Sequence, residues 1–431
     1  MNLQIESIDI RELKTGAKTC ASDHVLTINV KELEEVLLKG NGGLKSVDIH
    51  LVYPGDSVRI VNLMDVVQPR CKIDVQDADF PGFIGKVQRA GVGRTRSLRG
   101  IAVMVANPYT KRHYSALLDM GGKAAELSKY GQMRNVVVVP HGTEDAEDRD
   151  FEDAVKIAGL KTAVYLAQAA DGHPPDEIEY FDLHLPSLPR DNGLPRVACY
   201  YQLYTPQHDY KGISDKCFYG TDVRNLLPTI IHPNEVLDGG VTGHQTIRSL
   251  DTYTVQNHGV IRELYSRHGR DLTFCGVVIG VANMDPIQRQ RKAMMASGLI
   301  ANVLGADGVM TVKAHGGMPH VDTGLVAEEC EKLGVKTVYS IQCLVGHGSL
   351  AEAAIYGSDL LDAIVVTGAP VEKMKLAFKP ERVLGGSPKT KIYHPDPVTQ
   401  FAGDSNIEVE EFLIAGVHDQ TCGARIIVSE Y

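Results

Sequence analysis

The chain has 431 residues, of which 43% are hydrophobic and 23% are charged, and its formal net charge is −10. This length allows two or three domains with sizeable cores, and the acidic balance argues against a general nucleic-acid binder. The apolar runs are shorter than the roughly 20 residues of a membrane span, and the charged first residues are unlike a signal peptide. A cytoplasmic protein that does not associate with membranes is therefore expected.

The eight cysteines stand singly, without a CxxC pair. This pattern favours reduced thiols over a disulfide framework or a zinc knuckle. Most of these cysteines are expected to act as small buried hydrophobic residues.

The first 130 residues are predicted to form a β-rich domain. One helix is predicted over 30–40, and Gly40 is the residue that signals its C-terminal end. Segment 80–100, with five glycines and five basic residues, predicts a loop that could meet an anion, although a solvated loop is the commoner explanation. Its GVG fragment lacks the third glycine and the following helix of a dinucleotide site, which is excluded. Short β-branched or alternating runs predict strands at 3–10, 24–30, 46–53, 57–64 and 101–107.

From residue 131 on, the sequence predicts α/β units. The run NVVVVP at 135–140 is typical of a strand buried on both faces. A helix with an acidic first turn is expected over 145–170, and a strand over 196–204. The last third alternates strands and helices, which predicts a parallel sheet covered on both faces. These elements are strands 273–282, 308–314, 336–344 and 363–369 and helices 288–305, 323–334 and 349–361.

The expected fold class is therefore α/β, with an N-terminal β-rich domain followed by parallel-sheet α/β units. The domain organisation expected from these patterns is a β-rich domain 1–130, a first α/β unit 131–237, a polar loop 238–259 and a second α/β unit 260–431. The polar loop lacks apolar periodicity, and linker is its default interpretation.

Three predicted strand ends carry side chains that could do chemistry. Ligands of parallel sheets gather at the carboxyl ends of strands, and His315 and His320 follow one such end, Cys343 and His347 a second, and Asn283 a third. A thiolate–imidazolium pair would make a nucleophile, while the imidazoles could instead hold zinc. Neither spacing matches a known signature, and a buried structural thiol is the commoner role of a lone cysteine. The glycines between the first two histidines favour a loop that faces a ligand.

Nine segments, taken in their order, resemble one known family. The chain is similar to the proprotein subunit of component B of the glycine, sarcosine and betaine reductases, to which the D-proline reductase proprotein is related. The resemblance covers most of the 431 residues. The segments are PGDSVRIVNLMDVVQPR, FPGFIGKVQRAGVGRTRSLRG, NVVVVP, EDAVKIAGLKTAVYLAQAA, PDEIEYF, LPTIIHPNEVLDGG, IRELYSRHGRDLTFCGVVI, ANVLGADGVM and GVKTVYS.

The resemblance implies a self-processing site within the polar loop. In the family, a cysteine there rearranges its preceding peptide bond to an ester, the chain breaks, and the new terminus becomes a pyruvoyl group that captures the substrate amine. Here Gln245 stands at that position, and it has no thiol or hydroxyl for the acyl shift. Thr242 and Thr246 could cleave but would give a ketobutyryl group, and Ser249 lies four residues downstream. An intact chain without pyruvoyl is therefore expected.

Two strand-end loops also depart from the family pattern. AHGGMPHVD at 314–322 replaces an acidic and polar loop, and CLVGHGS at 343–349 replaces a loop with a carboxylate and an arginine. The departures add three imidazoles and a thiol. The expected catalytic residues are Cys343, His347, His315 and His320, and the expected substrate-binding residues are His244, Gln245, Thr246 and Asn283.

The resemblance implies a subunit of a reductase system that acts on a small amine or amino-acid-like substrate, at a C–N or related carbon–heteroatom bond. Its expected partner is a component B type subunit with a cysteine or selenocysteine, in an oligomeric assembly. Two alternatives stay open. One is a metal- or thiol-dependent lyase or hydrolase, so a metal ion stays open as a cofactor. The other is a non-catalytic scaffold or substrate-binding subunit.

Overall fold

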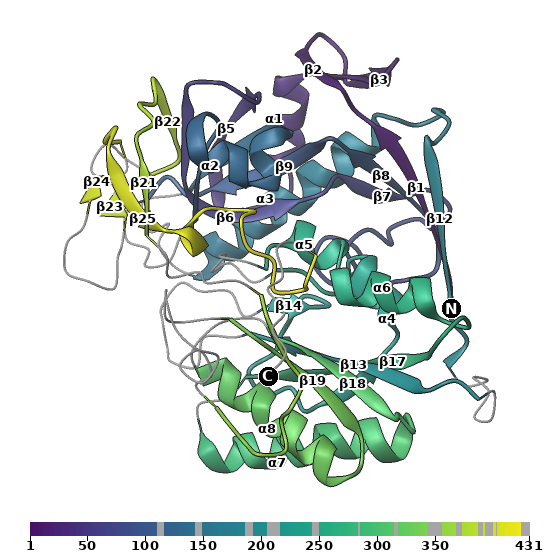
Figure 1. Cartoon of the computed structure of the whole chain (residues 1–431). Coiled ribbons are helices and arrows are strands. Elements are labelled where there is room, and N and C mark those ends of the chain that lie inside the picture. Colours follow the sequence, from purple (N-terminus) through teal and green to yellow (C-terminus); the bar gives the residue numbers. More distant parts are fainter. Residues whose placement is uncertain are drawn as a thin grey trace.

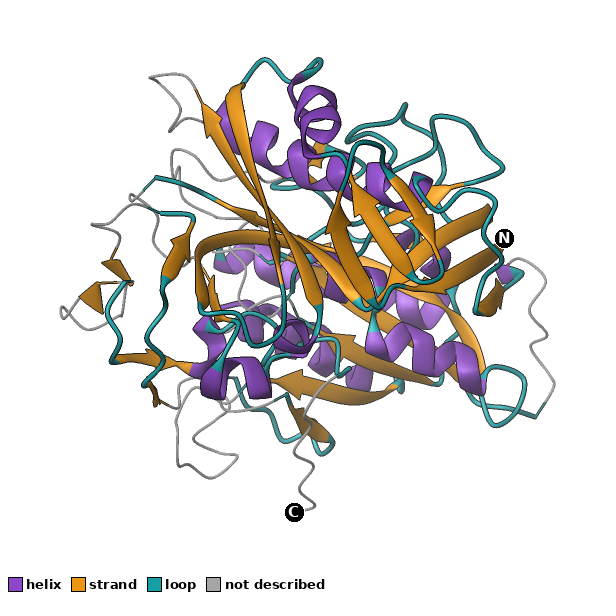
Figure 2. Ribbon diagram, turned by 90° about the horizontal axis from the view of Figure 1, so that it is seen from above, coloured by secondary structure: helices purple, strands orange, loops and turns teal. Residues whose placement is uncertain are grey.

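The computed structural model describes residues 1–109, 116–142, 149–185, 193–204, 216–243, 250–282, 285–313, 318–342, 356–367, 373–386, 391–392, 400–401 and 403–423. Three larger sheets dominate it, two of six strands and one of four, with helices packed against them (Figure 1). The α/β class expected from the sequence is confirmed. Figure 2 shows the same elements from above, with strands and helices interleaved.

The four-stranded sheet has the order β12-β1-β8-β7. Its strands are β1 (Asn2–Asp9), β7 (Arg70–Lys72), β8 (Gly93–Arg99) and β12 (Glu177–Asp182). The expectation of a loop over 80–100 is wrong for its second half, because β8 pairs in parallel with β1. The basic side chains of β8 are held by carboxylates of neighbouring segments and so do not form a free anion site. These ion pairs are Arg94–Glu6, Arg96–Asp171 and Arg99–Asp9.

The second sheet has the order β10-β6-β9-β11-β5, and β22 joins it beside β6. Strands β6, β9 and β10 are buried along their whole length, and the continuous apolar sequence of β9 fits burial on both faces. Helix α3 (Arg149–Gln168) packs on this sheet and has the expected acidic first turn, with Asp150 and Glu152. The strands are β5 (Leu44–Val52), β6 (Val58–Val67), β9 (Ile101–Ala106), β10 (Ala116–Asp119), β11 (Arg134–Gly142) and β22 (Arg382–Leu384).

Helix α1 (Val30–Leu38) confirms the helix predicted over 30–40. It begins at Asn29, whose side chain accepts a hydrogen bond from the backbone N–H of Glu32. It ends before Gly40, which has a φ of +67°, a backbone conformation that favours glycine. Other short elements of the N-terminal part are β2 (Glu12–Thr15), β3 (Cys20–Ser22), β4 (Val25–Ile28), α2 (Gly122–Leu127) and η1 (Lys129–Gln132).

The third sheet confirms the parallel sheet expected in the last third. Its order is β16-β17-β13-β18-β19-β20, and every pair except β16–β17 is parallel. Numbered along the chain, the five parallel strands follow the order 2-1-3-4-5, a doubly wound arrangement whose direction reverses between β13 and β18. The strands are β13 (Arg196–Leu203), β16 (Thr229–Ile231), β17 (Thr273–Val281), β18 (Gly308–Val312), β19 (Lys336–Ile341) and β20 (Ile364–Val366).

Helices cover both faces of the third sheet (Figure 1). α7 (Pro286–Gly298) and α8 (Met318–Lys332) share one apolar cluster with the sheet, and α5 (Thr252–Gln256) and α6 (Gly259–Arg267) share the cluster on its other face. The α7 helix continues into a π-helical turn, Leu299–Val303. The helix expected over 349–361 lies mostly outside the described residues, and its described part, from residue 356, is not helical.

The remaining elements are short. They are β14 (Lys216–Phe218), β15 (Thr221–Asp222), α4 (Pro233–Leu237), β21 (Lys373–Leu376), β23 (Lys391–Ile392), β24 (Gln400–Phe401), β25 (Ile407–Glu410) and η4 (Glu411–Leu413). None of the described helices has the length and apolar character needed to cross a membrane. Most described cysteines are buried, as the sequence predicts: Cys71, Cys199, Cys217, Cys275 and Cys330.

The sheets are built across the expected domain limits. β13, expected in the first α/β unit, pairs with β17 and β18 of the second unit, and β22 pairs with β6 of the N-terminal part. The four-part division stays a prediction. The polar segment 238–259 differs from the expected loop because α5 forms within it. Its described polar side chains are buried against other segments, as Thr252 is against Asp65 and Gln256 against Gln68.

Candidate functional site

The polar segment that the sequence singled out lies over a buried acid on β6. The pairing of β6 with β9 shifts register between Leu63 and Asp65, and such a bulge turns a side chain in a new direction. The Asp65 carboxylate accepts hydrogen bonds from the backbone N–H and the hydroxyl of Thr252, at 2.9 and 2.6 Å. Burial raises the pKa of Asp65 to about 7, although Lys156 and the Thr252 hydrogen bonds act in the opposite direction.

A buried cation lies opposite this acid. Lys156 projects from α3, is 3% exposed, and donates from Nζ to the backbone carbonyls of Lys216 and Gly243, both at 2.8 Å. Burial lowers the pKa of Lys156, and the nearby Asp65 raises it. The lysine therefore fixes the position of the backbone at Gly243, the last described residue before segment 244–249.

The two ends of segment 244–249 lie side by side. The Gly243 N–H donates to the Thr252 hydroxyl at 3.0 Å. A Cβ atom on Gly243 would lie 2.6–2.8 Å from backbone atoms of residues 250–252, so only glycine allows this approach. We call Asp65, Lys156, Gly243, Asp251 and Thr252 the polar cluster.

The second end of the segment is held through Asp251. Its side chain accepts hydrogen bonds from the Tyr130 hydroxyl at 2.6 Å and from the Thr254 N–H at 2.7 Å, which makes it the N-cap of α5. Lys129 donates to the Thr254 hydroxyl at 2.8 Å. These contacts join the N-terminal part of the chain to the start of α5.

Residues near the C-terminus complete this region. We call residues 418–423 the cap segment, because Thr421 accepts hydrogen bonds from the first N–H groups of α6. Its hydroxyl binds Gly259 N–H at 3.1 Å and its carbonyl binds Val260 N–H at 2.9 Å. Asp419 of the cap segment lies 4.0 Å from the Lys129 ammonium. In Figure 1 this part of the chain passes beside α5, between the N-terminal sheets and the third sheet.

A small hollow lies where the polar segment begins. Its lining includes Arg70, Lys72, Asp79, Thr95 and Asp238. The Asp238 carboxylate accepts from Lys72 Nζ at 3.0 Å and from the Thr95 hydroxyl at 2.6 Å. Burial raises the pKa of Asp79 to about 6. Because Asp238 is already paired, the hollow mainly anchors the start of the segment.

The structure describes one of the eight residues that the sequence assigned to the site. His320 is fully buried at the start of α8, and its Nε2 accepts the backbone N–H of Gln342 at 3.2 Å. Its carbonyl accepts the Tyr339 hydroxyl at 2.8 Å. These contacts suit a positioning role, and the assignment of His320 as catalytic stays a prediction.

The other seven assigned residues lie outside the described residues, so their placement is untested: His244, Gln245, Thr246, Asn283, His315, Cys343 and His347. Within the described ranges, no group of three His, Cys, Asp or Glu side chains could hold a metal ion.

Sequence reasoning missed Asp65, Lys156 and Lys313. Each had a signal, because a charged residue interrupts an apolar pattern in NLMDVV, in DAVKIAG and directly after the strand GVMTV. Burial of an unpaired charge is costly, so such interruptions indicate a partner elsewhere in the fold. The identity of that partner requires the structure.

Comparison with known proteins shows which family the chain is similar to. The family of glycine/sarcosine/betaine reductase component B subunits matches residues 1–427. The chain is 30% identical to the glycine reductase complex component B subunits alpha and beta of Acetoanaerobium sticklandii, over 100% of both chains. It is also 30% identical to the sarcosine reductase complex component B subunit alpha of Peptoclostridium acidaminophilum, over 85% of this chain and 86% of the relative. The betaine reductase complex component B subunit alpha of the same organism is 29% identical, over 99% of this chain and 98% of the relative.

No solved structure matches the chain. The family match over nearly all residues and the similarity to three kinds of component B subunit, over 85–100% of this chain, agree with the resemblance drawn from the sequence. The chain belongs to the family of glycine/sarcosine/betaine reductase component B subunits.

Proposed function

We propose that the chain works as the component B subunit of a reductase complex and acts on a small amine or amino-acid-like substrate, at a C–N or related carbon–heteroatom bond. The observation that supports this proposal is the full-length similarity to the component B subunits of a glycine reductase complex. A partner subunit with a reactive thiol or selenol would complete the reaction. The polar cluster supports substrate contact at segment 244–249, because it holds both ends of that segment in place.

A pyruvoyl group does not fit the residues present. Gln245 has no thiol or hydroxyl that could attack its preceding carbonyl. Among the described residues, Thr242 is buried and its hydroxyl has no hydrogen-bond partner, yet dehydration of a threonine yields ketobutyryl. The proposed activity therefore proceeds without a pyruvoyl electrophile.

The purified protein is expected to be one intact polypeptide of 46.9 kDa. Intact mass spectrometry of the protein, isolated together with its partners, measures the chain and identifies the partner subunit at once. Two fragments that split between residues 241 and 249, with a carbonyl-reactive new terminus, would contradict the proposal. In that case Thr242, Thr246 or Ser249 has replaced the missing cysteine.

The proposed catalytic side chains are Cys343, His347, His315 and His320, and the proposed substrate contacts are His244, Gln245, Thr246 and Asn283. Strand geometry supports the first group. β18 and β19 are neighbouring parallel strands that end at Val312 and Ile341. The segments with His315 and Cys343 therefore begin at the same edge of the sheet, where ligands of doubly wound folds bind.

Replacing Cys343, His315 or His347 by alanine is expected to lower turnover at least about a hundredfold, the lower end of what positioned proton transfer contributes. Turnover per folded molecule in the reconstituted complex is the measurement, and alkylation of Cys343 by iodoacetamide is a second one. Cys20→Ala, which removes an exposed thiol, is the matched control. Near-normal turnover in all three variants, with Cys343 resistant to alkylation, would remove the thiol–imidazole site.

A further inference from the structure

Lys313 occupies the point of the third sheet where ligands of doubly wound folds bind. It directly follows β18, and β18 pairs with β13 up to the register Tyr201↔Val312. Gln202 follows Tyr201 on β13, just as Lys313 follows Val312, so both residues stand one position beyond the last paired residues of these two strands. The strand order reverses between β13 and β18, and the carboxyl ends at such a reversal are where ligands of doubly wound folds bind.

The Lys313 amine is buried without a carboxylate. The residue is 0% exposed, and within the described part of the chain its single hydrogen bond runs from Nζ to the Gln420 side-chain oxygen at 3.2 Å. By contrast, Lys72 and Arg289 are buried beside Asp238 and Asp322. Among the described side chains, Cys422 is the ionisable group that acts on Lys313 electrostatically.

Burial lowers the pKa of Lys313 well below its ordinary value, and the weak opposing effect of Cys422 does not restore it. Because the lysine lacks a carboxylate partner in the described structure, burial favours its neutral form over its charged form. A desolvated, neutral lysine amine is the form that attacks carbonyl carbon atoms.

We propose that Lys313 is a nucleophilic amine that binds a small carbonyl compound covalently as an imine. The Nζ lone pair attacks the carbonyl carbon, the C=O bond breaks, and the two amine protons leave with the oxygen as water while C=N forms. Water reverses the reaction and releases the carbonyl compound. The proposed reductase role needs no lysine nucleophile, although Lys313 lies at the same edge of the sheet as the segments with the proposed catalytic residues.

The neighbours of Lys313 define the ligand class. Gln420 is an uncharged amide, and Gln202 is a fully buried one. Gln202 donates to the Pro319 carbonyl at 3.0 Å, while its side-chain oxygen has no hydrogen-bond partner among the described residues. An unused acceptor selects a ligand with a hydroxyl or N–H donor. The fitting ligand is therefore a small, uncharged hydroxyaldehyde.

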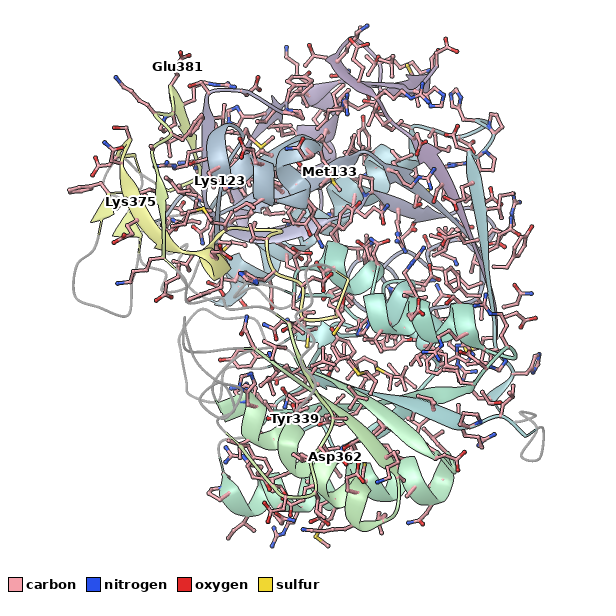
Figure 3. All side chains as sticks on the ribbon, in the orientation of Figure 1. Lys123, Met133, Tyr339, Asp362, Lys375 and Glu381 are labelled. Carbon is pink, nitrogen blue, oxygen red and sulfur yellow. The ribbon has the colours of Figure 1, made fainter. Side chains whose placement is uncertain are left out.

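The test uses glycolaldehyde as the probe and cyanoborohydride as the hydride donor that converts the imine to a stable secondary amine. The full-length protein is labelled at pH 7.4, and peptide mass spectrometry measures the labelling rate of each lysine. A solvated lysine is deprotonated in about one molecule in a thousand at this pH. Lys313 is expected to react at least about tenfold faster than the exposed Lys123 and Lys375, which lie far from Tyr339 of β19 in Figure 3.

The pH profile separates a reactive amine from a structural one. Between pH 7 and 9 the labelling rate of exposed lysines rises about tenfold per pH unit. The rate of Lys313, whose pKa is lowered, rises less, so the ratio of Lys313 to Lys123 labelling is expected to fall as the pH rises. Lys313→Met is expected to remove the fast phase from the intact-mass time course. If Lys313 stays unlabelled while Lys123 reacts, or if both share one rate and pH profile, the proposal is overturned. Lys313 then only ties the cap segment to β18.

Discussion

Replacing Lys156 by methionine is expected to lower the free energy of unfolding by about 2–4 kcal/mol, because leaving a buried acceptor without its donor costs about 1–3 kcal/mol. Methionine keeps most of the apolar stem but has no ammonium. The carbonyls of Lys216 and Gly243 lose their donor, and the Asp65 carboxylate loses the nearby positive charge. Urea unfolding followed by circular dichroism measures the change.

Lys161→Met is the matched control, because Lys161 lies on the same helix. It is partly exposed and donates to one carbonyl, that of Lys39, at 2.7 Å. Its loss is expected to cost less than about 1 kcal/mol, as for other solvated contacts. Adding Asp65→Asn to Lys156→Met is expected to recover part of the loss, because the two charges interact. Equal effects of the two lysine variants would show that Lys156 is not a buried anchor.

The protein is expected to lose stability steeply on acidification, and His258 is expected to be a main cause. His258 is fully buried at the start of α6, where its Nδ1 accepts the backbone N–H of Ile261 at 3.3 Å. Protonation would break this bond and place a buried cation at the positive end of the helix. Burial accordingly lowers the pKa of His258 from 6.5 to about 3.

The sign of the pH dependence follows from this pKa. Between pH 6.5 and pH 3, His258 is protonated in the unfolded chain but stays unprotonated in the folded chain. The free energy of unfolding therefore falls as the pH falls, by on the order of 4–5 kcal/mol over the whole window. This contribution is fully present above pH 6.5. Burial also lowers the pKa of His232, to about 4, so His232 adds to the same trend.

His258→Asn isolates the contribution of His258, because asparagine also caps helices but does not titrate. From pH 6.5 to pH 4 the variant is expected to lose about 3 kcal/mol less stability than the natural chain. His141→Asn, which removes a partly exposed histidine beside Asp48, is the control for the loss of any histidine. If His258→Asn leaves the pH dependence of urea unfolding unchanged, the buried imidazole is not its cause.

The sequence by itself determined the fold class and much of the last third. Local periodicity predicted α1, its end at Gly40, and the alternation of strands and helices that forms the third sheet. These features depend on residues that are neighbours in the sequence, so a local pattern is enough to reveal them. That Gln245, which has no thiol or hydroxyl, stands within the polar segment is also visible in the sequence alone.

The tertiary structure decided what the buried charges do. From the sequence, segment 80–100 was expected to be a basic loop. In the structure its arginines pair with carboxylates of other segments, and sequence spacing does not show such pairs. Lys156 holds Gly243 across 87 positions, and Thr252 binds Asp65 across 187. The sequence shows Lys313 only as a lysine that follows a strand. Its burial, with no carboxylate partner among the described residues, depends on β13 and the cap segment folding against it. Whether a charged side chain is reactive or structural depends on its burial from water and on its interaction partners. The whole fold decides both, and a local sequence pattern shows neither.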